Sequence, residues 1–82
     1  MRLKPHQRVS AEVAEARALD VLSKNVGRPL YATEVAAVIW PDHQMKPQGA
    51  GAAASRILKR LERRKLAKWK FIAYVGQGWV KT

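Results

Sequence analysis

The stretch from Gly49 to Lys70, GAGAAASRILKRLERRKLAKWK, decides how this chain folds. On a helix, one apolar stripe at the spacing i, i+3, i+4, i+7 consists of Ala54, Ile57, Leu58 and Leu61. The opposite side consists of Ala52, Ser55, Arg56, Lys59 and Arg63. Because the apolar stripe must be buried against other elements, we expect the basic side to face outward, where it can approach a polyanion.

The positive charge of the chain is concentrated in its C-terminal half. The 82 residues carry 16 basic and 6 acidic side chains, a net charge of +10. Residues 46–82 hold ten of the basic side chains and one of the acidic ones. This asymmetry indicates an anionic partner, and nucleic acid is the leading candidate because a concentrated basic face displaces the counterions condensed on the phosphates. The alternative is a solvated basic surface that serves solubility.

The length and composition indicate one small folded domain. The chain is 48% hydrophobic, which predicts a core and not a disordered basic tail. The lack of cysteine excludes disulfides and thiolate zinc sites. No apolar run reaches the roughly 20 residues that span a bilayer, and the basic N-terminus lacks the apolar segment of a signal peptide. We therefore expect a cytoplasmic protein, associated with the nucleoid if DNA is its partner.

A basic arm and a first helix are expected to precede the quoted stretch. Residues 1–9 read as the arm, and residues 10–82 as the folded domain. Ser10 is a good N-cap for a helix over residues 10–25, and Gly27 supplies its left-handed stop. The buried stripe of this helix is predicted to consist of Ala14, Ala18, Leu19, Leu22 and Val26.

Two more helices are predicted between this first helix and the C-terminal strands. The second covers residues 32–40, where the following proline ends it. The third covers residues 50–64 and follows a polar turn. An earlier start, with Pro47 at the first helical position, is the alternative. The start decides whether Gln48 lies on the helix.

After the third helix, basic and aromatic residues alternate. Period-two alternation predicts a strand over residues 67–74, a turn at Gly76–Gly78 and a returning strand over residues 78–81. The aromatic residues of this hairpin are expected to complete the core; they are Trp69, Phe71, Tyr74 and Trp79. The alternative is that they stack on the bases of single-stranded nucleic acid, since aromatic residues interleaved with lysine bind in that way.

The predicted fold is mainly α with a small β-hairpin, and its order of elements resembles the winged helix-turn-helix family. Residues Ala54–Leu66 look like the run S-R-x-L-x-x-L-E-x-x-G-L-V that ends many bacterial recognition helices and enters the wing. Residues 29–36 are similar to the start of the family's second helix, and the GWVKT ending to its second wing strand. Lys65 stands where the family has Gly, and Ala67 where it has Val. The resemblance is to small regulators of bacterial chromosomes, phages and mobile elements.

This resemblance implies a sequence-specific double-stranded DNA-binding protein that acts as a small transcriptional regulator. Its recognition helix would lie in the major groove. Base contacts are then expected from Gln48, Ala52, Ala53, Ser55, Arg56 and Lys59. Phosphate contacts are expected from Lys46, Arg60, Arg63, Arg64, Lys68 and Lys70. Arg56 is the leading candidate for base reading, because its guanidinium can pair with guanine O6 and N7.

Two other functions fit the same sequence. One is a non-specific or architectural DNA-binding protein in replication, packaging or nucleoid organisation. The other is a winged-helix module for protein–protein interaction, whose exposed patch would include Trp40, Ile72 or Tyr74. An enzyme is not expected, since His6 and His43 are isolated and lack the paired spacing of metal ligands. No cofactor, metal, membrane or small-molecule ligand is expected, and a homodimer is plausible on palindromic DNA.

Overall fold

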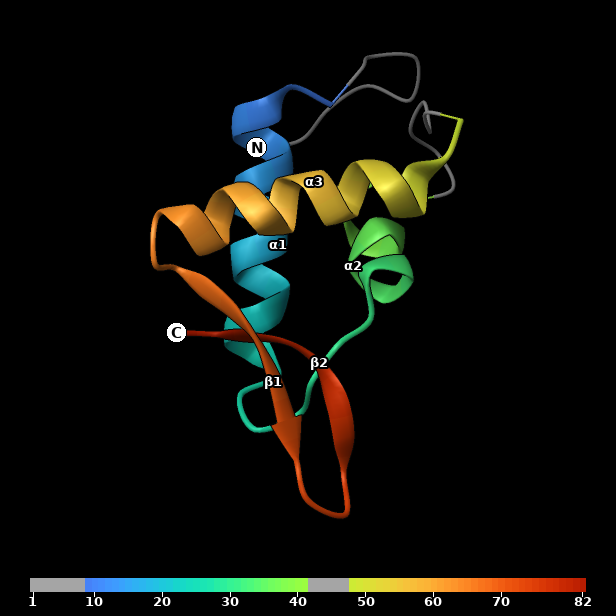
Figure 1. Ribbon diagram of the computed structural model, residues 1–82. Helices are drawn as coiled ribbons and strands as arrows, with labels where there is room; N and C mark the ends of the chain where they lie inside the picture. Colours follow the sequence, from blue (N-terminus) through green and yellow to red (C-terminus); the bar gives the residue numbers. More distant parts are fainter. Residues whose placement is uncertain (1–8, 42–47) are drawn as a thin grey trace.

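The computed structural model describes residues 9–41 and 48–82, in which three helices are followed by two strands (Figure 1). The elements are α1 (Ala11–Lys24), α2 (Ala32–Ile39), α3 (Ala50–Arg63), β1 (Ala67–Ile72) and β2 (Gly76–Lys81). The strands form one antiparallel hairpin. The predicted fold class and the predicted order of elements are confirmed. Except for Val9, the predicted basic arm lies outside the described residues.

The core lies where the three helices meet the base of the hairpin. Helix α3 crosses in front of α1, and the hairpin extends away from the helices (Figure 1). Each helix contributes one stripe to this core, and the four residues predicted for α3 are all buried. The largest fully buried side chains are Leu22, Val35, Ile39, Leu58 and Leu61. Burial of this stripe turns the opposite face of α3 outward, as the sequence predicts.

Helix α1 has the predicted start but ends earlier than predicted. The hydroxyl of Ser10 accepts a hydrogen bond from the backbone N–H of Val13 at 3.2 Å. The helix ends at Lys24, and Gly27 adopts the predicted left-handed conformation with φ +85°. The prediction that Val26 is buried is wrong, because the helix ends two residues before it and the turn leaves it 79% exposed.

Helix α2 is stabilised by hydrogen bonds at both ends. At its start, the carboxylate of Glu34 accepts a hydrogen bond from the backbone N–H of Tyr31 at 3.2 Å. At its end, the Arg17 guanidinium of α1 donates to the carbonyl of Ile39 at 2.7 Å. Trp40 caps the helix and is buried. Of the three residues named for an exposed patch in the protein-interaction alternative, Trp40 is therefore excluded, whereas Tyr74 is fully exposed.

Helix α3 begins at Ala50, after Gly49 in the left-handed conformation (φ +71°). The alternative, an earlier start that would place Gln48 on the helix, is wrong, because Gln48 lies in a turn before the helix. At the other end, the N–H of Lys65 donates to the carbonyl of Glu62, and the N–H of Leu66 to that of Leu61, each at 2.9 Å. This is a Schellman motif. Lys65 adopts the left-handed conformation (φ +61°) that the family resemblance assigns to Gly.

The hairpin differs from its prediction in the position of its turn. Strand β1 ends at Ile72, and the turn consists of residues 73–75, so that the expected turn at Gly76–Gly78 is wrong. These glycines belong to β2. The reason is a close approach of main chains: Trp79 and Leu30 exchange two backbone hydrogen bonds at 2.8 and 3.0 Å. A Cβ on Gly78 would lie 2.7 Å from the Leu30 carbonyl oxygen.

The contact at Gly78 predicts that Gly78→Ala destabilises the fold. Its Cβ would meet the backbone of Leu30, which cannot move without breaking the bridge to Trp79. We expect a loss of about 1–3 kcal/mol in the free energy of unfolding, as for other overpacking substitutions. Urea unfolding followed by tryptophan fluorescence measures it.

Gly51→Ala is the matched control for this prediction. A Cβ at Gly51 meets only the side-chain methyl of Thr33, at 3.4 Å, and alanine favours the helix by up to roughly 1 kcal/mol. The control should be neutral or stabilising. Equal destabilisation by both substitutions would refute the role of the Leu30 contact.

Candidate nucleic-acid interface

The outward face of α3 brings together four of the predicted contact residues. Ala52, Arg56, Lys59 and Arg63 are all exposed and follow one another at the spacing i, i+4, i+7, i+11. Ser55 lies beside them and is half-buried, and Arg60 is exposed at the edge of this face. We call this set of six residues the α3 basic face. It begins with a small residue and becomes cationic one turn later.

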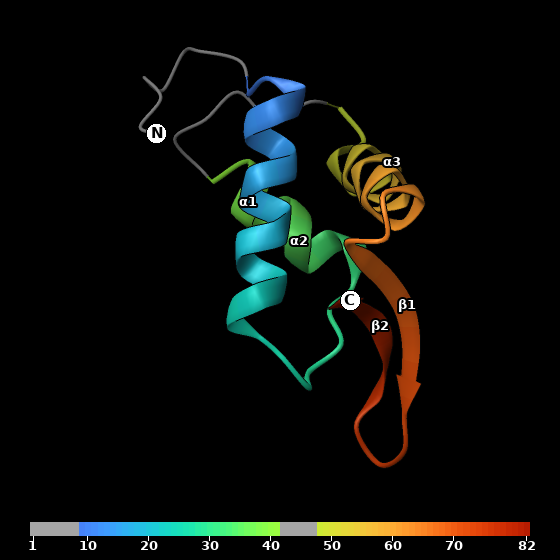
Figure 2. The same ribbon diagram turned by 90° about the vertical axis from the view of Figure 1, so that its left-hand side faces the viewer.

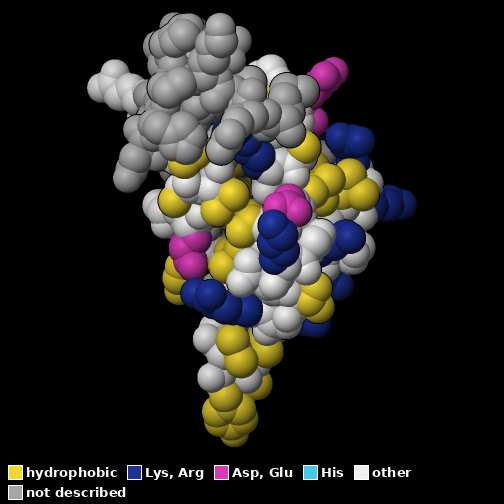
Figure 3. Space-filling view, turned by 180° about the vertical axis from the view of Figure 1, so that it is seen from behind, with side chains coloured by type: hydrophobic (Ala, Val, Ile, Leu, Met, Phe, Trp, Pro, Cys, Tyr) yellow, Lys and Arg dark blue, Asp and Glu magenta, His cyan; other side chains and the backbone are white. Residues whose placement is uncertain are grey.

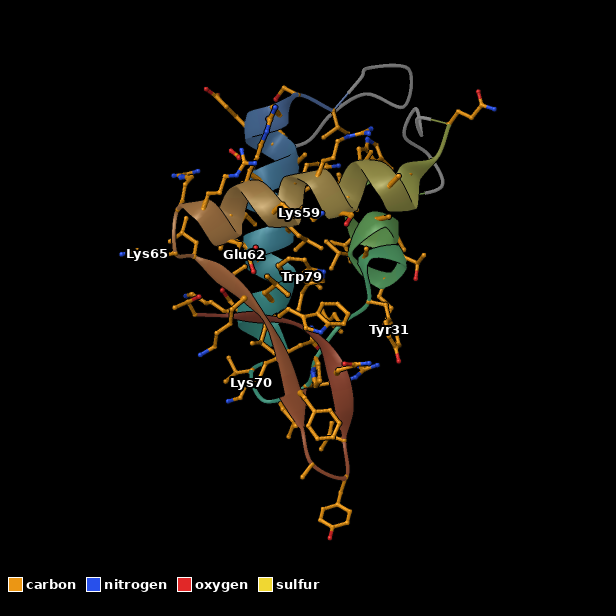
Figure 4. All side chains as sticks on the ribbon, viewed as in Figure 1. Tyr31, Lys59, Glu62, Lys65, Lys70 and Trp79 are labelled. Carbon is orange, nitrogen blue, oxygen red and sulfur yellow. The ribbon has the colours of Figure 1, made fainter. Side chains whose placement is uncertain are left out.

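The cations of the α3 basic face have few neighbours of opposite charge. Among residues 9–41 and 48–82, no ion pair or side-chain hydrogen bond involves Arg56, Lys59, Arg60 or Arg63. The single acidic residue of α3 is Glu62, which follows Lys59 by three residues and extends towards the hairpin without forming an ion pair with a described residue (Figure 4). Like charges thus stand one turn apart on one exposed surface, an arrangement that destabilises a helix by a few tenths of a kcal/mol per pair.

Three of the predicted contact residues are placed differently. Gln48 is exposed but precedes the helix. Ala53 is half-buried and packs against the hydrophobic core, on a different side from Ala52. Arg64 forms an ion pair with Glu15 of α1 at 3.5 Å. Lys46 lies outside the described residues.

The hairpin adds cations on the same side of the molecule as α3. Lys68 and Lys70 are exposed on β1, as predicted. The view turned by 90° places β1 directly below α3, with α1 on the opposite side (Figure 2). Lys65 and Lys81 are also exposed, and the prediction did not include them. The basic run before the first strand could have identified Lys65 as part of this surface. For Lys81 the sequence gives no such signal, and only the strand register shows that it lies opposite Ala67, at the start of β1.

The aromatic residues of the hairpin divide into a buried and an exposed group. Trp79 is buried, and Trp69 packs edge-on against it, with 5.7 Å between the ring centroids. Trp69 is still 47% exposed, Phe71 is 69% exposed and Tyr74 is fully exposed. The expectation that these residues complete the core is correct for Trp79 and wrong for Phe71 and Tyr74. The reason is that the hairpin extends past the helices (Figure 1).

Comparison of this chain with protein-family models, with curated proteins and with solved structures finds no match. Its functional interpretation therefore depends on the geometry of its own residues. No helix in the described ranges is long and apolar enough to cross a membrane. Within the same ranges, no three side chains of His, Asp or Glu come together in a way that could hold a metal ion.

The crowding of like charges on α3 predicts that Lys59→Glu stabilises the fold. Lys59 lies one turn from Arg56, Arg63 and Glu62, so glutamate at this position makes two repulsive pairs attractive and one attractive pair repulsive, a net gain of one favourable pair. We expect a gain of about 0.5–1 kcal/mol in the free energy of unfolding, smaller at high salt. Urea unfolding at two salt concentrations measures it.

Lys24→Glu is the control, at an exposed helical lysine that has an acidic partner. Lys24 pairs with Asp20 at 2.9 Å, so the same change of charge should destabilise the fold slightly. A loss of stability in both variants would contradict the idea that the α3 basic face is under electrostatic strain.

Proposed function

We propose that this protein binds double-stranded DNA as a small transcriptional regulator of the winged helix-turn-helix type. The observation that carries the proposal is the orientation of α3. Its apolar stripe is held in the core, while the α3 basic face points outward. A major groove is wide enough to admit such a helix, and its phosphate walls attract cations on both sides.

The composition of the α3 basic face suits a helix that enters the groove by its N-terminal half. Ala52 has a small side chain and lets the helix backbone come near the bases. Arg56 follows one turn later and Lys59 one turn after that. Arg56 is the side chain best suited to read a base, because its planar guanidinium can donate two hydrogen bonds to guanine O6 and N7.

The remaining cations suit contact with the sugar–phosphate backbone. Arg60 and Arg63 lie in the second half of α3, and Lys68 and Lys70 continue the positive surface along β1. Such contacts position a protein on DNA without reading its sequence. Two copies on a palindromic site would read more base pairs than the single basic helix of one copy can.

One observation favours a second candidate, a non-specific or architectural DNA-binding protein. With Gln48 outside the helix and Ala53 towards the core, few polar side chains remain for base reading. The positive charge is by contrast abundant. The two candidates share the same surface and differ in whether Arg56 discriminates between bases.

The proposal predicts a base-specific effect of Arg56→Ala. Selection from a random duplex library first identifies the preferred site. The substitution should then weaken binding to that site by about 1–3 kcal/mol and relax the preference at one base pair, with little effect on random DNA. The side chain is exposed and stands among like charges, so the stability of the fold should not fall.

Lys68→Ala is the comparison variant for phosphate contact. It should weaken binding to preferred and random DNA equally and lower the slope of log affinity against log salt by about 1. If Arg56→Ala behaved in the same way as Lys68→Ala, the non-specific candidate would be favoured. If neither duplex bound to the unmodified protein, DNA binding itself would be refuted.

A further inference from the structure

The far end of the hairpin carries an apolar surface that the proposed duplex contacts do not use. It consists of Phe71, Tyr74 and Val75, and we call these three residues the hairpin tip. Phe71 is 69% exposed, Val75 is 58% exposed and Tyr74 is fully exposed. Hydrophobic side chains cover this end of the molecule in the space-filling view (Figure 3). Contiguous exposed apolar surface of this kind is typical of interaction sites.

The backbone at Tyr74 makes the presence of an aromatic residue harder to explain by folding. Tyr74 has φ +66°, a left-handed conformation that Gly and Asn adopt far more readily than a bulky residue. Its fully exposed ring gains nothing from packing in return. Neither turn geometry nor core packing therefore accounts for tyrosine at this position.

The surroundings of the hairpin tip restrict the chemistry of a partner. The strands that lead to it carry Lys68, Lys70 and Lys81, all exposed, and residues 67–82 contain no acidic side chain. A fitting partner is anionic and also presents flat apolar faces. Nucleic acid offers both, since bases stack on aromatic side chains while lysines follow the phosphates. In an uninterrupted duplex these base faces already stack on one another, so unpaired bases offer the better surface.

We propose that the hairpin tip stacks on unpaired bases, so that the preferred target is duplex DNA interrupted by unpaired nucleotides. This inference rests on the proposed function, because α3 would hold the duplex beside the opening. Helix α3 and β1 lie on the same side of the molecule, so one DNA can contact both (Figure 2). Phe71 and Tyr74 supply the stacking rings, and Lys70 lies opposite Gly78 between them and the helices.

Fluorescence anisotropy with two probes tests the inference. One probe is a blunt duplex, and the other is the same duplex with a central run of unpaired thymines. The unmodified protein should bind the interrupted duplex about tenfold more tightly. Tyr74→Asn, which suits the left-handed backbone, and Phe71→Thr, which suits the strand, should each reduce this ratio and leave binding to the blunt duplex unchanged. Tyr74→Phe keeps the ring and should retain the ratio.

A base analogue whose fluorescence is quenched by stacking, placed in the unpaired run, gives a second readout. Its signal should change on binding of the unmodified protein and less on binding of Tyr74→Asn. Equal affinity for both probes, or equal weakening of both by Tyr74→Asn, would overturn the inference while leaving the proposed function intact. Self-association of the free protein that Tyr74→Asn abolishes would also overturn it, since the tip would then bind a second copy. Failure to bind either probe would overturn both.

Discussion

Burial of one side of α3 is the constraint on which the rest of this structure depends. Ala54, Leu58 and Leu61 of this stripe have no solvent exposure, and the stripe packs against two helices that are rich in alanine. In a domain of this size a single core supplies nearly all of the stability. The same burial orients the cations of α3 outward, so that the packing of the core also determines the orientation of the basic surface.

A second constraint connects the hairpin to the helices. Leu30, between α1 and α2, exchanges backbone hydrogen bonds with Trp79 of β2, which makes it a one-residue third strand at the base of the hairpin. Gly78 permits this approach because it has no side chain in the way. The hairpin is thus held at its base and extends freely beyond it. Its lysines lie between α3 and the tip, while its aromatic tip lies beyond the helices (Figure 4).

The α3 basic face and the hairpin tip both lower the stability of the fold, and neither contributes to the core. The α3 basic face places like charges one turn apart, and the hairpin tip exposes aromatic rings and holds Tyr74 in a conformation that disfavours it. Features that lower stability without serving the core are common at functional sites. Both surfaces carry positive charge or adjoin it, which is why we propose one polyanionic partner for the two.

The sequence by itself determined the number, kind and order of the elements, because periodicity, capping residues and breakers act over a few neighbouring residues. It also determined which side of α3 is buried and that Arg56 and Lys59 face outward together. Only the tertiary structure decided the position of the hairpin turn, the placement of Gln48 and the exposure of Phe71 and Tyr74. Glycine signals a turn locally, but at Gly78 it serves contact with Leu30, a residue distant in sequence. Likewise, alternation of lysine and aromatic residues predicts a strand, yet whether its rings reach the core depends on how far the hairpin extends past the helices.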